Sequence, residues 1–431
     1  MLRFGSALAL VALVAVAACG GREEGPRERL LPPAPPPPAA PPEPTIAQGI
    51  CAIEQADVHV EPNAESRVRG ILRWGARFAL SDRRDVNGET WWRVRAAGWV
   101  KGTDVRTKTD GEPQLGFIPF QPKLDRPMPY NIARVIARDG VPVYRRPPPR
   151  GEPADRYVMR TLREGYFFTL DKAVNIYDRQ LYRGITYWFI PREGTTPVVA
   201  PDFEGVPVTR EMRFPFLWVT DPTARLCANP LAPGQPGIAF CEPIARHSRI
   251  PLVGQRNVQG GVWYQVEGGK WIPYMQVARV HEVERLPSGL HEGERWIHVD
   301  LRNQFAALYE GREMKFVTLI SSGDDQHPTP TGTYRLESRH ITARMDSEDN
   351  PSGAYFIQDV PWVMYFKGGY ALHGAFWHDR FGLKTSHGCV NLAPRDARRF
   401  FEFATSPALP PGLHGVFTQP DEQGTLVHVT N

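Results

Sequence analysis

The sequence predicts a mainly β protein made of several small units, with a single helix near its C-terminus. Three observations lead to this prediction. Short segments rich in Trp, Tyr and Val are separated by glycine-containing turns, which is typical of β-hairpins. After residue 295, apolar and polar residues alternate with the period of two that a strand requires. At 431 residues the chain exceeds one ordinary hydrophobic core, so we expect roughly two to four domains.

The first 18 residues are typical of a secretory signal peptide, because a basic residue precedes the apolar run from Leu8 to Ala18. This run is too short to cross a bilayer as a helix. With the three residues before it, Cys19 resembles a bacterial lipobox. The resemblance implies that Cys19 is lipidated and anchors the protein in the cell envelope on the periplasmic side, and the glycine that follows favours the outer membrane. Cleavage of an ordinary secretory signal near the same position is the alternative.

Residues 19–48 predict a tether between this anchor and the folded part of the chain. Nine of the fourteen residues from Leu31 to Pro44 are proline. Such a segment forms neither helix nor sheet, because proline lacks an N–H group and fixes φ. We expect extended polyproline II structure, at about 3.1 Å per residue.

Composition and charge limit the partners that the sequence favours. The net charge is +4, with 23% charged residues and no block of Lys or Arg, which does not favour nucleic acid. A mild positive charge favours an anionic surface such as a cell-wall polymer. A second apolar stretch of membrane length is missing, so the lipid anchor is the one membrane contact that we expect. Cys227 and Cys241 would pair as a disulfide in an oxidising envelope or stay reduced, and the sequence leaves both open.

The middle of the chain contains an internal repeat. Two segments share the same spacing: Trp91–Val94, Trp99–Val100 and Val105 in the first, and Trp263–Val266, Trp271–Ile272 and Val277 in the second. Each predicts a strand, a tight turn and a second strand. The segment from Tyr187 to Ile190 is a candidate for a degenerate third copy.

Residues 49–108 resemble a bacterial SH3-like domain, a small barrel often attached to cell-wall enzymes. Short strands expected around Val58–Val60 and Leu72–Gly75 fit this resemblance. The middle region, residues 130–283, would contain one or two related β modules. The resemblance implies modules that bind peptidoglycan or position the protein on it. The alternative is that the Trp and Val residues simply form the core of each barrel.

Residues 294–420 predict a separate β-rich domain. The alternating residues from Trp296 to Leu301 predict a strand. Two further strands flank the turn at Glu310–Arg312, and Thr329–Gly332 has Pro and Gly placed for a β-turn. Pro394 is a favourable first residue for the one helix. Starting there, four apolar residues share one helical face: Ala397, Phe400, Phe401 and Ala404.

Two short segments carry the candidate chemistry: His373-Gly374 and Ser386-His387-Gly388-Cys389-Val390-Asn391. A cysteine attacks as a thiolate, so it needs a base within reach and a backbone that exposes its sulfur. The two histidines are candidate bases, and Gly388 lets the chain pass close beside the nucleophile. The pattern therefore predicts a nucleophilic Cys389, because a buried structural cysteine would need no such neighbours.

With these segments, the C-terminal region resembles the catalytic domain of the L,D-transpeptidase family. Its motifs follow the order of the family: Ile297–Leu301 with Gln304, Ser321–Gly323, Thr329–Gly332, Met364–Phe366, Tyr370–Gly374 and Ser386–Leu392. They span less than a third of the chain. Twelve residues separate His373 from Ser386, toward the short end for the family, and this departure concerns the size of the intervening loop.

The resemblance implies acyl transfer on peptidoglycan stem peptides, without a metal or organic cofactor. Cys389 would attack the amide carbonyl of the third stem residue and release the terminal D-alanine, with His373 as proton acceptor and donor. An imidazolium beside the thiolate would lower the pKa of the thiol. The N–H groups of Gly388 and Cys389 would hold the oxyanion. An amine from a neighbouring stem would then resolve the thioester and form a crosslink.

The resemblance implies supporting roles for other residues of the nucleophile segment. His387 would shape the site beside the nucleophile, although it could also be the primary base. Ser386 and Asn391 would fix the loop through hydrogen bonds to the backbone.

The substrate groove would be lined by Tyr365, Trp377 and His378, with a core position as an equal alternative for Trp377. No Asp has an obvious place to orient the catalytic imidazole. The carbonyl of Gly374 is the candidate for this role, and Asp379 is the alternative.

Other functions remain open from the sequence. A zinc site would need four side chains whose spacing fits no compact zinc motif: His373, His378, His387 and Cys389. In a papain-like peptidase the cysteine precedes the histidine, which is the reverse of the order here. With water as acceptor, the same residues would give an L,D-carboxypeptidase or a crosslink hydrolase. A non-catalytic peptidoglycan-binding scaffold, or an envelope protein as the acyl acceptor, are further alternatives.

Overall fold

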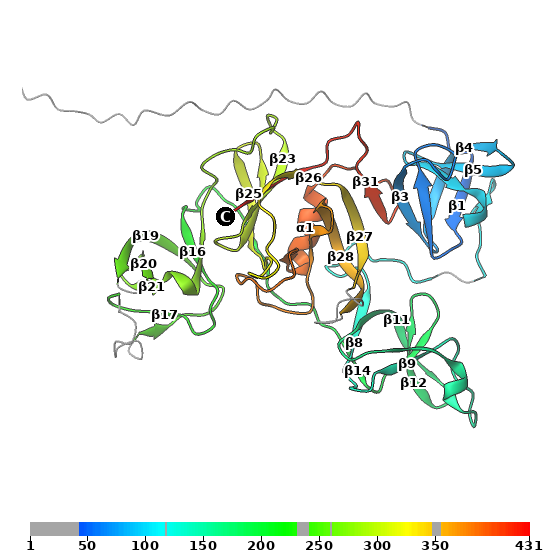
Figure 1. Cartoon of the computed structure of the whole chain (residues 1–431), viewed down its shortest axis with the longest axis horizontal. Coiled ribbons are helices and arrows are strands. Elements are labelled where there is room, and N and C mark those ends of the chain that lie inside the picture. The colour runs from blue at the N-terminus through cyan, green and yellow to red at the C-terminus, as the bar shows by residue number, and fades with distance from the viewer. Residues whose placement is uncertain (1–42, 117–118, 231–240, 259–260, 347–354) are drawn as a thin grey trace, which may run out of the picture.

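The structure is a computed structural model that describes residues 43–116, 119–230, 241–258, 261–346 and 355–431 (Figure 1). The predicted signal peptide, the predicted lipidation site Cys19 and the predicted tether up to residue 42 lie outside the described residues. Within these residues the chain is mainly β with one α-helix, which confirms the predicted fold class. No helix in the described part of the chain is both long and apolar enough to span a membrane.

Three small β modules precede the C-terminal domain. Module 1 (residues 43–108) contains β1 (Ala47–Cys51), β2 (Gln55–His59), β3 (Val68–Arg73), β4 (Arg77–Val86), β5 (Glu89–Val94), β6 (Gly98–Lys101) and β7 (Val105–Lys108). Module 2 (residues 131–197) contains β8 (Asn131–Val135), β9 (Val141–Tyr144), β10 (Val158–Leu162), β11 (Phe167–Ile176), β12 (Arg179–Gly184), β13 (Phe189–Pro191) and β14 (Thr195–Pro197). Module 3 (residues 216–280) contains β16 (Phe216–Val219), β17 (Arg225–Leu226), β18 (Glu242–Pro243), β19 (Arg249–Val258), β20 (Gly261–Val266), β21 (Trp271–Pro273) and β22 (Val277–Val280).

The three modules share one pairing scheme. In each, the first strand pairs with both the long fourth strand and the last strand, while the second strand pairs with the third. The pairing between the fourth and fifth strands is interrupted by a bulge after equivalent residues: Leu80, Leu170 and Leu252. The fifth and sixth strands pair in one register: Trp92–Val100, Tyr182–Ile190 and Tyr264–Ile272. The middle region thus contains two modules, joined by residues 198–215.

The third copy of the repeat lies slightly away from where the sequence pattern placed it. The predicted segment starts at Tyr187, whereas the equivalent hairpin is formed by β12 and β13, and Tyr187 lies in the turn between them. Gly184 stands where the other copies have valine. A Cβ at this position would lie 2.4 Å from the ring of Trp188, so Trp188 fills the space of the missing valine side chain. This exchange hides the copy in the sequence.

The tryptophans that mark the repeat belong to the cores of the modules. Trp91, Trp99, Trp263 and Trp271 are each at most 7% exposed. A side chain so deeply buried cannot present its ring to a ligand, so the core interpretation is correct for these four positions.

The C-terminal domain consists of two sheets and α1 (Pro394–Phe403). One sheet has the order β15 (Val206–Pro207), β25 (Glu313–Leu319), β24 (Phe305–Glu310), β23 (Arg295–Asp300), β32 (Leu426–Thr430) and β26 (Gly332–Arg335). The other contains β31 (Gly415–Phe417), β27 (Ser338–Asp346), β28 (Phe356–Lys367), β29 (Tyr370–Gly374) and β30 (Val390–Leu392). The predicted hairpin around Gly311 and the helix from Pro394 are confirmed. Because β32 pairs with β23 inside the sheet, the folded domain continues past the predicted end at residue 420.

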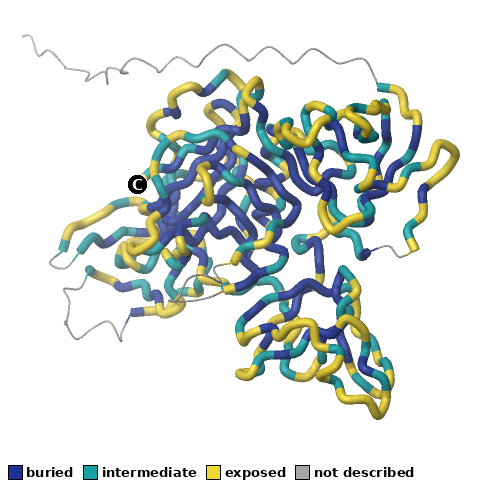
Figure 2. The backbone as a smooth tube through the Cα atoms, turned by 45° about the vertical axis from the view of Figure 1, so that its right-hand side comes forward, coloured by how far each residue is buried: buried dark blue, intermediate teal, exposed yellow. Residues whose placement is uncertain are grey.

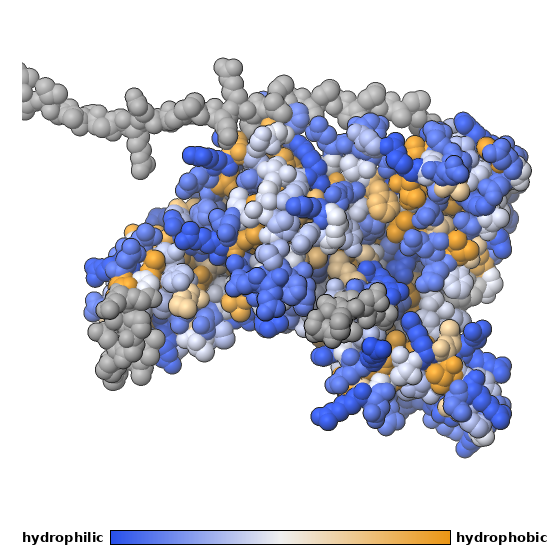
Figure 3. Space-filling view, in the orientation of Figure 1, coloured by the Kyte–Doolittle hydropathy of each residue, from blue (hydrophilic) through white to orange (hydrophobic). Residues whose placement is uncertain are grey.

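The main core lies between these two sheets and the helix. Ile297 and Val299 from the first sheet, Leu372 and Val390 from the second, and Phe400 from α1 belong to one buried cluster. Figure 2 shows this concentration of buried backbone in the central domain, whereas the outer loops of the modules are exposed. Hydrophilic side chains cover most of the face in Figure 3. The core therefore fixes the relative position of β29 and β30, which carry the candidate catalytic segments.

Modules 1 and 2 extend the second sheet of the C-terminal domain. Strand β3 of module 1 pairs with β31, and β11 of module 2 pairs with β28. The buried carboxylate of Asp359 joins all three parts. It accepts hydrogen bonds from Arg73 of module 1, from Thr169 of module 2 (2.6 Å) and from Thr342 of its own domain (2.7 Å).

Module 3 packs instead on the outer face of the first sheet. Trp218 and Val280 of module 3 share a buried cluster with Trp296 and Phe305 of the C-terminal domain.

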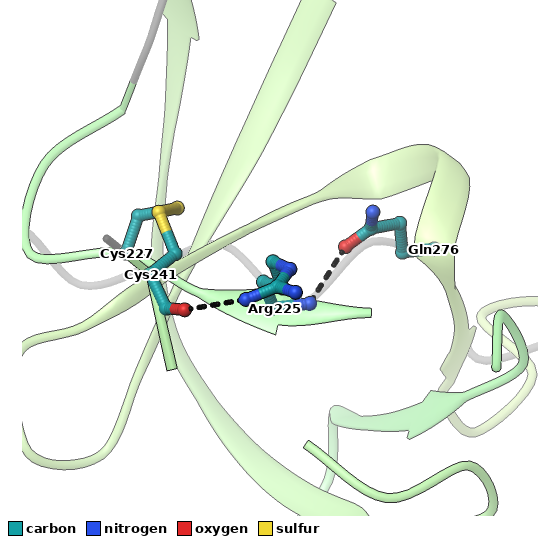
Figure 4. The surroundings of a disulfide bond; sticks show 4 residues. All are labelled: Arg225, Cys227, Cys241 and Gln276. Atoms are coloured by element: carbon teal, nitrogen blue, oxygen red, sulfur yellow. Dashed lines mark hydrogen bonds between the residues drawn. A yellow bond between two sulfur atoms is a disulfide. The ribbon is translucent and has the colours of Figure 1, made fainter. Parts of the chain in front are cut away.

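Within module 3, Cys227 and Cys241 form a disulfide with their Cα atoms 4.5 Å apart (Figure 4). The structure therefore resolves the pairing that the sequence left open. Cys51 stays a free, buried thiol in module 1, and burial raises its pKa to about 11.

Candidate active site

The register of two parallel strands, β29 and β30, brings the two candidate catalytic segments together. Leu372 pairs with Val390, and His373 pairs with Asn391. Leu372 and Val390 both point into the main core. Because side chains alternate along a strand, His373 and Asn391 lie on the opposite face, and Cys389, one residue before β30, lies on that face as well.

Hydrogen bonds within the nucleophile loop hold the backbone around Cys389. The hydroxyl of Ser386 donates to the carbonyl of Cys389 (2.5 Å) and accepts from the N–H of Gly388 (3.1 Å). Gly388 has a φ of +113°, and a Cβ there would lie 2.7 Å from the ring of Tyr370. Only glycine fits this position without strain.

A second loop supports the first. Thr329 donates from its hydroxyl to the carbonyl of Gly388 (2.7 Å) and accepts from the N–H of Gly323 (2.9 Å). Residues 329–331 have irregular backbone, so the β-turn predicted at Thr329–Gly332 is wrong. The hydrogen bond from Thr329 to Gly388 thus connects the motif at residues 329–332 to the nucleophile loop.

A cavity of about 310 Å³ opens over the face that carries Cys389. The predicted residues that line it are His373, Trp377, His378, Ser386, His387, Cys389 and Asn391. Residues that the sequence did not indicate also line it: Phe167, Met345, Tyr355, Ile357, Arg380 and Thr385. Arg380 and Thr385 lie between the two catalytic segments, so their position along the chain was an available signal. Phe167 belongs to module 2, and the sequence of the C-terminal domain could not have revealed it.

The Cys389 side chain is half-buried and protonated at neutral pH. Burial raises the pKa of the thiol, and a backbone hydrogen bond from Ala371 offsets this only in part. The thiol donates to the carbonyl of Gly369 at 3.7 Å. The sequence had suggested a thiolate whose pKa is lowered by an imidazolium, and the direction of the shift is the opposite. The cause is desolvation, which disfavours the charged form.

His373 is a buried, neutral imidazole. Burial lowers its pKa to about 4, so it can accept a proton at neutral pH. Its Nδ1 atom faces the carbonyl of Gly374 at 3.5 Å. A carbonyl only accepts, so this contact places the proton on Nδ1 and leaves Nε2 as the basic nitrogen. Gly374 thus has the position expected of an orienting carbonyl.

His378 has both ring nitrogens engaged. Nδ1 accepts a hydrogen bond from the backbone N–H of Arg380 (3.1 Å), and the side-chain amide of Asn391 lies 2.9 Å from Nε2. The Asn391 side chain thus contacts another side chain of the cavity, His378, in addition to the backbone role that the sequence predicted for it. The carboxylate of Asp379 pairs with Arg246 of module 3 at 3.2 Å and does not orient His373.

The three remaining predicted residues, His387, Trp377 and Tyr365, lie at different places around the cavity over Cys389. His387 is exposed at the cavity mouth, with its ring centroid 4.7 Å from that of His327. Trp377 is half-buried and lies 5.7 Å from His373, measured between ring centroids. Tyr365 borders a larger cleft of about 1100 Å³, where modules 1 and 2 meet the C-terminal domain. It packs in the same apolar cluster as Cys389 without lining the smaller cavity, and its pKa is raised by burial and by Cys389.

No group of three or more His, Cys, Asp or Glu side chains within the described ranges is arranged to hold a metal ion. The four side chains of the zinc alternative are all described, and they do not form such a group. The arrangement instead joins a thiol, a neutral imidazole and an apolar cavity wall, which are the components of nucleophilic acyl transfer.

Residues 294–429 match the family model of the L,D-transpeptidase catalytic domain (YkuD). L,D-transpeptidase 1 of Mycobacterium tuberculosis is 28% identical over 144 residues, which cover 31% of this chain and 56% of that protein. The putative L,D-transpeptidase YciB of Bacillus subtilis is 30% identical over 126 residues, covering 25% of this chain and 59% of that protein. The chain thus spans little more than half the length of these relatives.

A solved structure, the catalytic domain of an L,D-transpeptidase from E. faecium, is 25% identical. The match covers 32% of this chain and 99% of that domain, with a TM-score of 0.25. The family match identifies the C-terminal part of the chain as an L,D-transpeptidase catalytic domain, which confirms the resemblance for residues 294–429.

Proposed function

We propose that this protein is a peptidoglycan L,D-transpeptidase in which Cys389 carries the acyl group as a thioester. The observation that supports it most strongly is the shared face of β29 and β30. There His373 and Cys389 line one cavity inside the segment that matches the family. The neutral state of His373 suits a proton acceptor at envelope pH.

The first half-reaction forms a thioester and breaks an amide. Nε2 of His373 takes the thiol proton as Sγ of Cys389 attacks the carbonyl carbon of the third stem residue. The C–N bond to the terminal D-alanine then breaks, and the same proton passes to the leaving amine. Because the thiol starts protonated, its proton transfer accompanies the attack. A pre-formed ion pair is not required.

The oxyanion needs hydrogen-bond donors beside the sulfur, and we assign this role to the backbone of the nucleophile loop. The Gly388 N–H donates to Ser386 in the resting structure. Its use for the oxyanion therefore requires exchange of that hydrogen bond for one to the substrate. Each such donor contributes about 2.7–4 kcal/mol in other enzymes.

The second half-reaction transfers the acyl group to an amine of a neighbouring stem. The amine attacks the thioester carbonyl, His373 accepts its proton, and the thiolate leaves and is reprotonated. The broken amide supplies the energy through the thioester, so the step needs no nucleotide. We further propose that the three modules are SH3-like units that hold the enzyme on the wall, and that Cys19 is lipidated in the cell envelope.

The test is mass spectrometry of disaccharide-tetrapeptides incubated with the full-length protein. We expect a crosslinked dimer that has lost one D-alanine. Cys389→Ala should abolish it, because no other described thiol lines the cavity. Cys51→Ala is the matched control, since it removes the buried thiol of module 1 and should leave turnover intact.

Other products would change the proposal. Monomeric tripeptide without dimer would assign water as the acceptor and make the protein a carboxypeptidase. Turnover that persists in Cys389→Ala would remove the assigned nucleophile. Absence of any product with the folded wild-type protein would overturn activity on this substrate.

A further inference from the structure

One position of the repeat differs between the three modules. The long strands β4, β11 and β19 each have ten residues, and they begin with Arg77, Phe167 and Arg249. Because the bulge and pairing register of the three hairpins agree, these residues are structural equivalents. Module 2 thus has an aromatic ring where both sister modules have arginine.

Phe167 reaches the cavity that contains the nucleophile. It pairs with Ile357 of β28, and its ring meets that of Phe376 edge-on at 5.4 Å between centroids. It lines the cavity and belongs to the apolar cluster that includes Cys389 and Trp377. The side chain is only half-buried, so part of its ring remains available to a ligand.

The equivalent arginines have other surroundings. Arg77 forms an ion pair with Glu112 at 2.8 Å. Arg249 is exposed and borders a separate hollow in module 3. Neither lines the cavity over Cys389. Among the three modules, the aromatic residue therefore occurs in the one whose fourth strand pairs with the second sheet of the C-terminal domain.

Contacts on both sides of Phe167 fix its position. Tyr166 stacks on Phe356 with centroids 5.3 Å apart. Thr169 donates its N–H to the side chain of Gln358 (3.1 Å) and its hydroxyl to Asp359 (2.6 Å). From the neighbouring strand, the guanidinium of Arg134 lies 5.6 Å from the centre of the Phe167 ring. A rigidly held ring is suited to binding, because little side-chain entropy is lost.

We propose that Phe167 is a substrate-binding residue and that module 2 supplies one wall of the acyl-donor site. The aliphatic part of the donor stem peptide packs against the exposed part of the ring while its amide reaches Cys389. This inference rests on the proposed function. It assigns to module 2 a role in the active site itself, beyond holding the protein on the cell wall.

The kinetic test compares Phe167→Ala, Phe167→Arg and Arg249→Ala in the full-length protein. Removing the aromatic wall should raise KM for the disaccharide-tetrapeptide roughly 10-fold, equal to about 1.4 kcal/mol, with kcat within about twofold. Phe167→Arg should behave similarly and should fold, because both sister modules carry arginine at this position. Arg249→Ala should leave both constants unchanged. Unaltered KM in folded Phe167 variants would overturn the proposal.

A second measurement does not depend on turnover. Iodoacetamide and a maleimide with a bulky substituent would be compared as reagents for Cys389, with the adduct located by mass spectrometry. Phe167→Ala should raise the rate with the bulky reagent several-fold relative to iodoacetamide, because the cavity widens. An unchanged ratio would overturn the assignment of Phe167 as a wall. A wild-type protein without transpeptidation would instead refute the proposed function, so the two failures are distinguishable.

Discussion

Modules 2 and 3 have the same strand pairing but are attached to the C-terminal domain by different physical means. Module 2 continues the second sheet of the C-terminal domain and is held by buried polar contacts to Asp359. Module 3 lies on the face of the other sheet and is held mainly by apolar packing around Trp218. Its ion pair, Arg246 with Asp379, involves an exposed carboxylate. A repeated fold therefore does not imply a repeated role, since side chains outside the pairing scheme determine each interface.

The two kinds of interface should respond very differently to the loss of one carboxylate. The side chain of Asp359 is 1% exposed and that of Asp379 is 66% exposed. Burial opposes ionisation of Asp359, but Arg73 and the hydroxyl donors together still lower its pKa. Removing one partner of a buried pair leaves an uncompensated charge, whereas a surface pair is largely replaced by water.

The largest effect is expected for Asp359→Ala. It leaves the guanidinium of Arg73 without its buried partner and removes the acceptor for Thr169. We expect a loss of about 3–5 kcal/mol in the free energy of unfolding, measured by urea denaturation. The double variant Arg73→Ala/Asp359→Ala should lose less than the sum of the single variants, because the pair is coupled. Simple additivity would show that the junction does not act as a unit.

The segment that joins modules 2 and 3 contacts the C-terminal domain through a buried carboxylate, Asp396, so the stability of this contact should depend on pH. Both carboxylate oxygens of Asp396 accept hydrogen bonds from the N–H of Gly205 (3.1 and 3.0 Å), and Thr318 donates to one of them. Burial raises the pKa of Asp396 to about 7, although these hydrogen bonds lower it. The folded state therefore holds a proton that the unfolded chain releases near pH 4. The resulting stabilisation is complete at low pH and is lost as pH rises toward 7.

Asp396→Asn should flatten this pH dependence. The wild-type protein minus the variant isolates the contribution of Asp396, which is at most about 4 kcal/mol between pH 4 and pH 8. Urea denaturation at several pH values measures it. A difference that grows with rising pH would have the wrong sign and would refute the raised pKa.

Gly382→Ala should have a smaller effect, localised where module 3 meets the loop between β29 and β30. Gly382 has a φ of +97°, and a Cβ there would lie 2.2 Å from Cγ2 of Thr220 in module 3. We expect destabilisation of about 1–3 kcal/mol and lower kcat/KM, because the displaced loop carries Trp377 and His378. Adding Thr220→Ala should restore part of the loss. No restoration would mean that backbone strain alone causes the effect.

Local signals in the sequence predicted much of the C-terminal domain. Pro394 followed by apolar residues at helical spacing identified α1, and the glycine at residue 311 between apolar runs identified a hairpin. The sequence also singled out the two candidate catalytic segments, which lie side by side in the structure. Their contact depends on the parallel pairing of β29 with β30, and a pattern along the chain does not encode that pairing directly.

The interfaces between modules could not be predicted from the sequence, because they join residues far apart in the chain. Nothing local distinguishes Phe167, which faces the cavity, from its neighbour Phe168, which is 1% exposed and packs in the core of module 2. The third copy was misplaced because Gly184 and Trp188 together replace one valine. Desolvation of the half-buried Cys389 thiol also depends on long-range packing, so the prediction of a lowered pKa for this thiol was wrong.

The smallest effect is expected for Asp379→Asn, which tests the surface contact of module 3. Arg246 donates to three backbone carbonyls besides the carboxylate: Thr220 (3.0 Å), Asp379 itself (2.6 Å) and Phe381 (3.5 Å). Loss of the carboxylate leaves these acceptors in place, so we expect a change of about 0–1 kcal/mol in the free energy of unfolding, further reduced by salt. Arg246→Ala removes the donor to all three carbonyls and should cost more. If Asp379→Asn instead matched Asp359→Ala, module 3 would depend on a charge as strongly as module 2 does, and exposure would not explain the difference between the two interfaces.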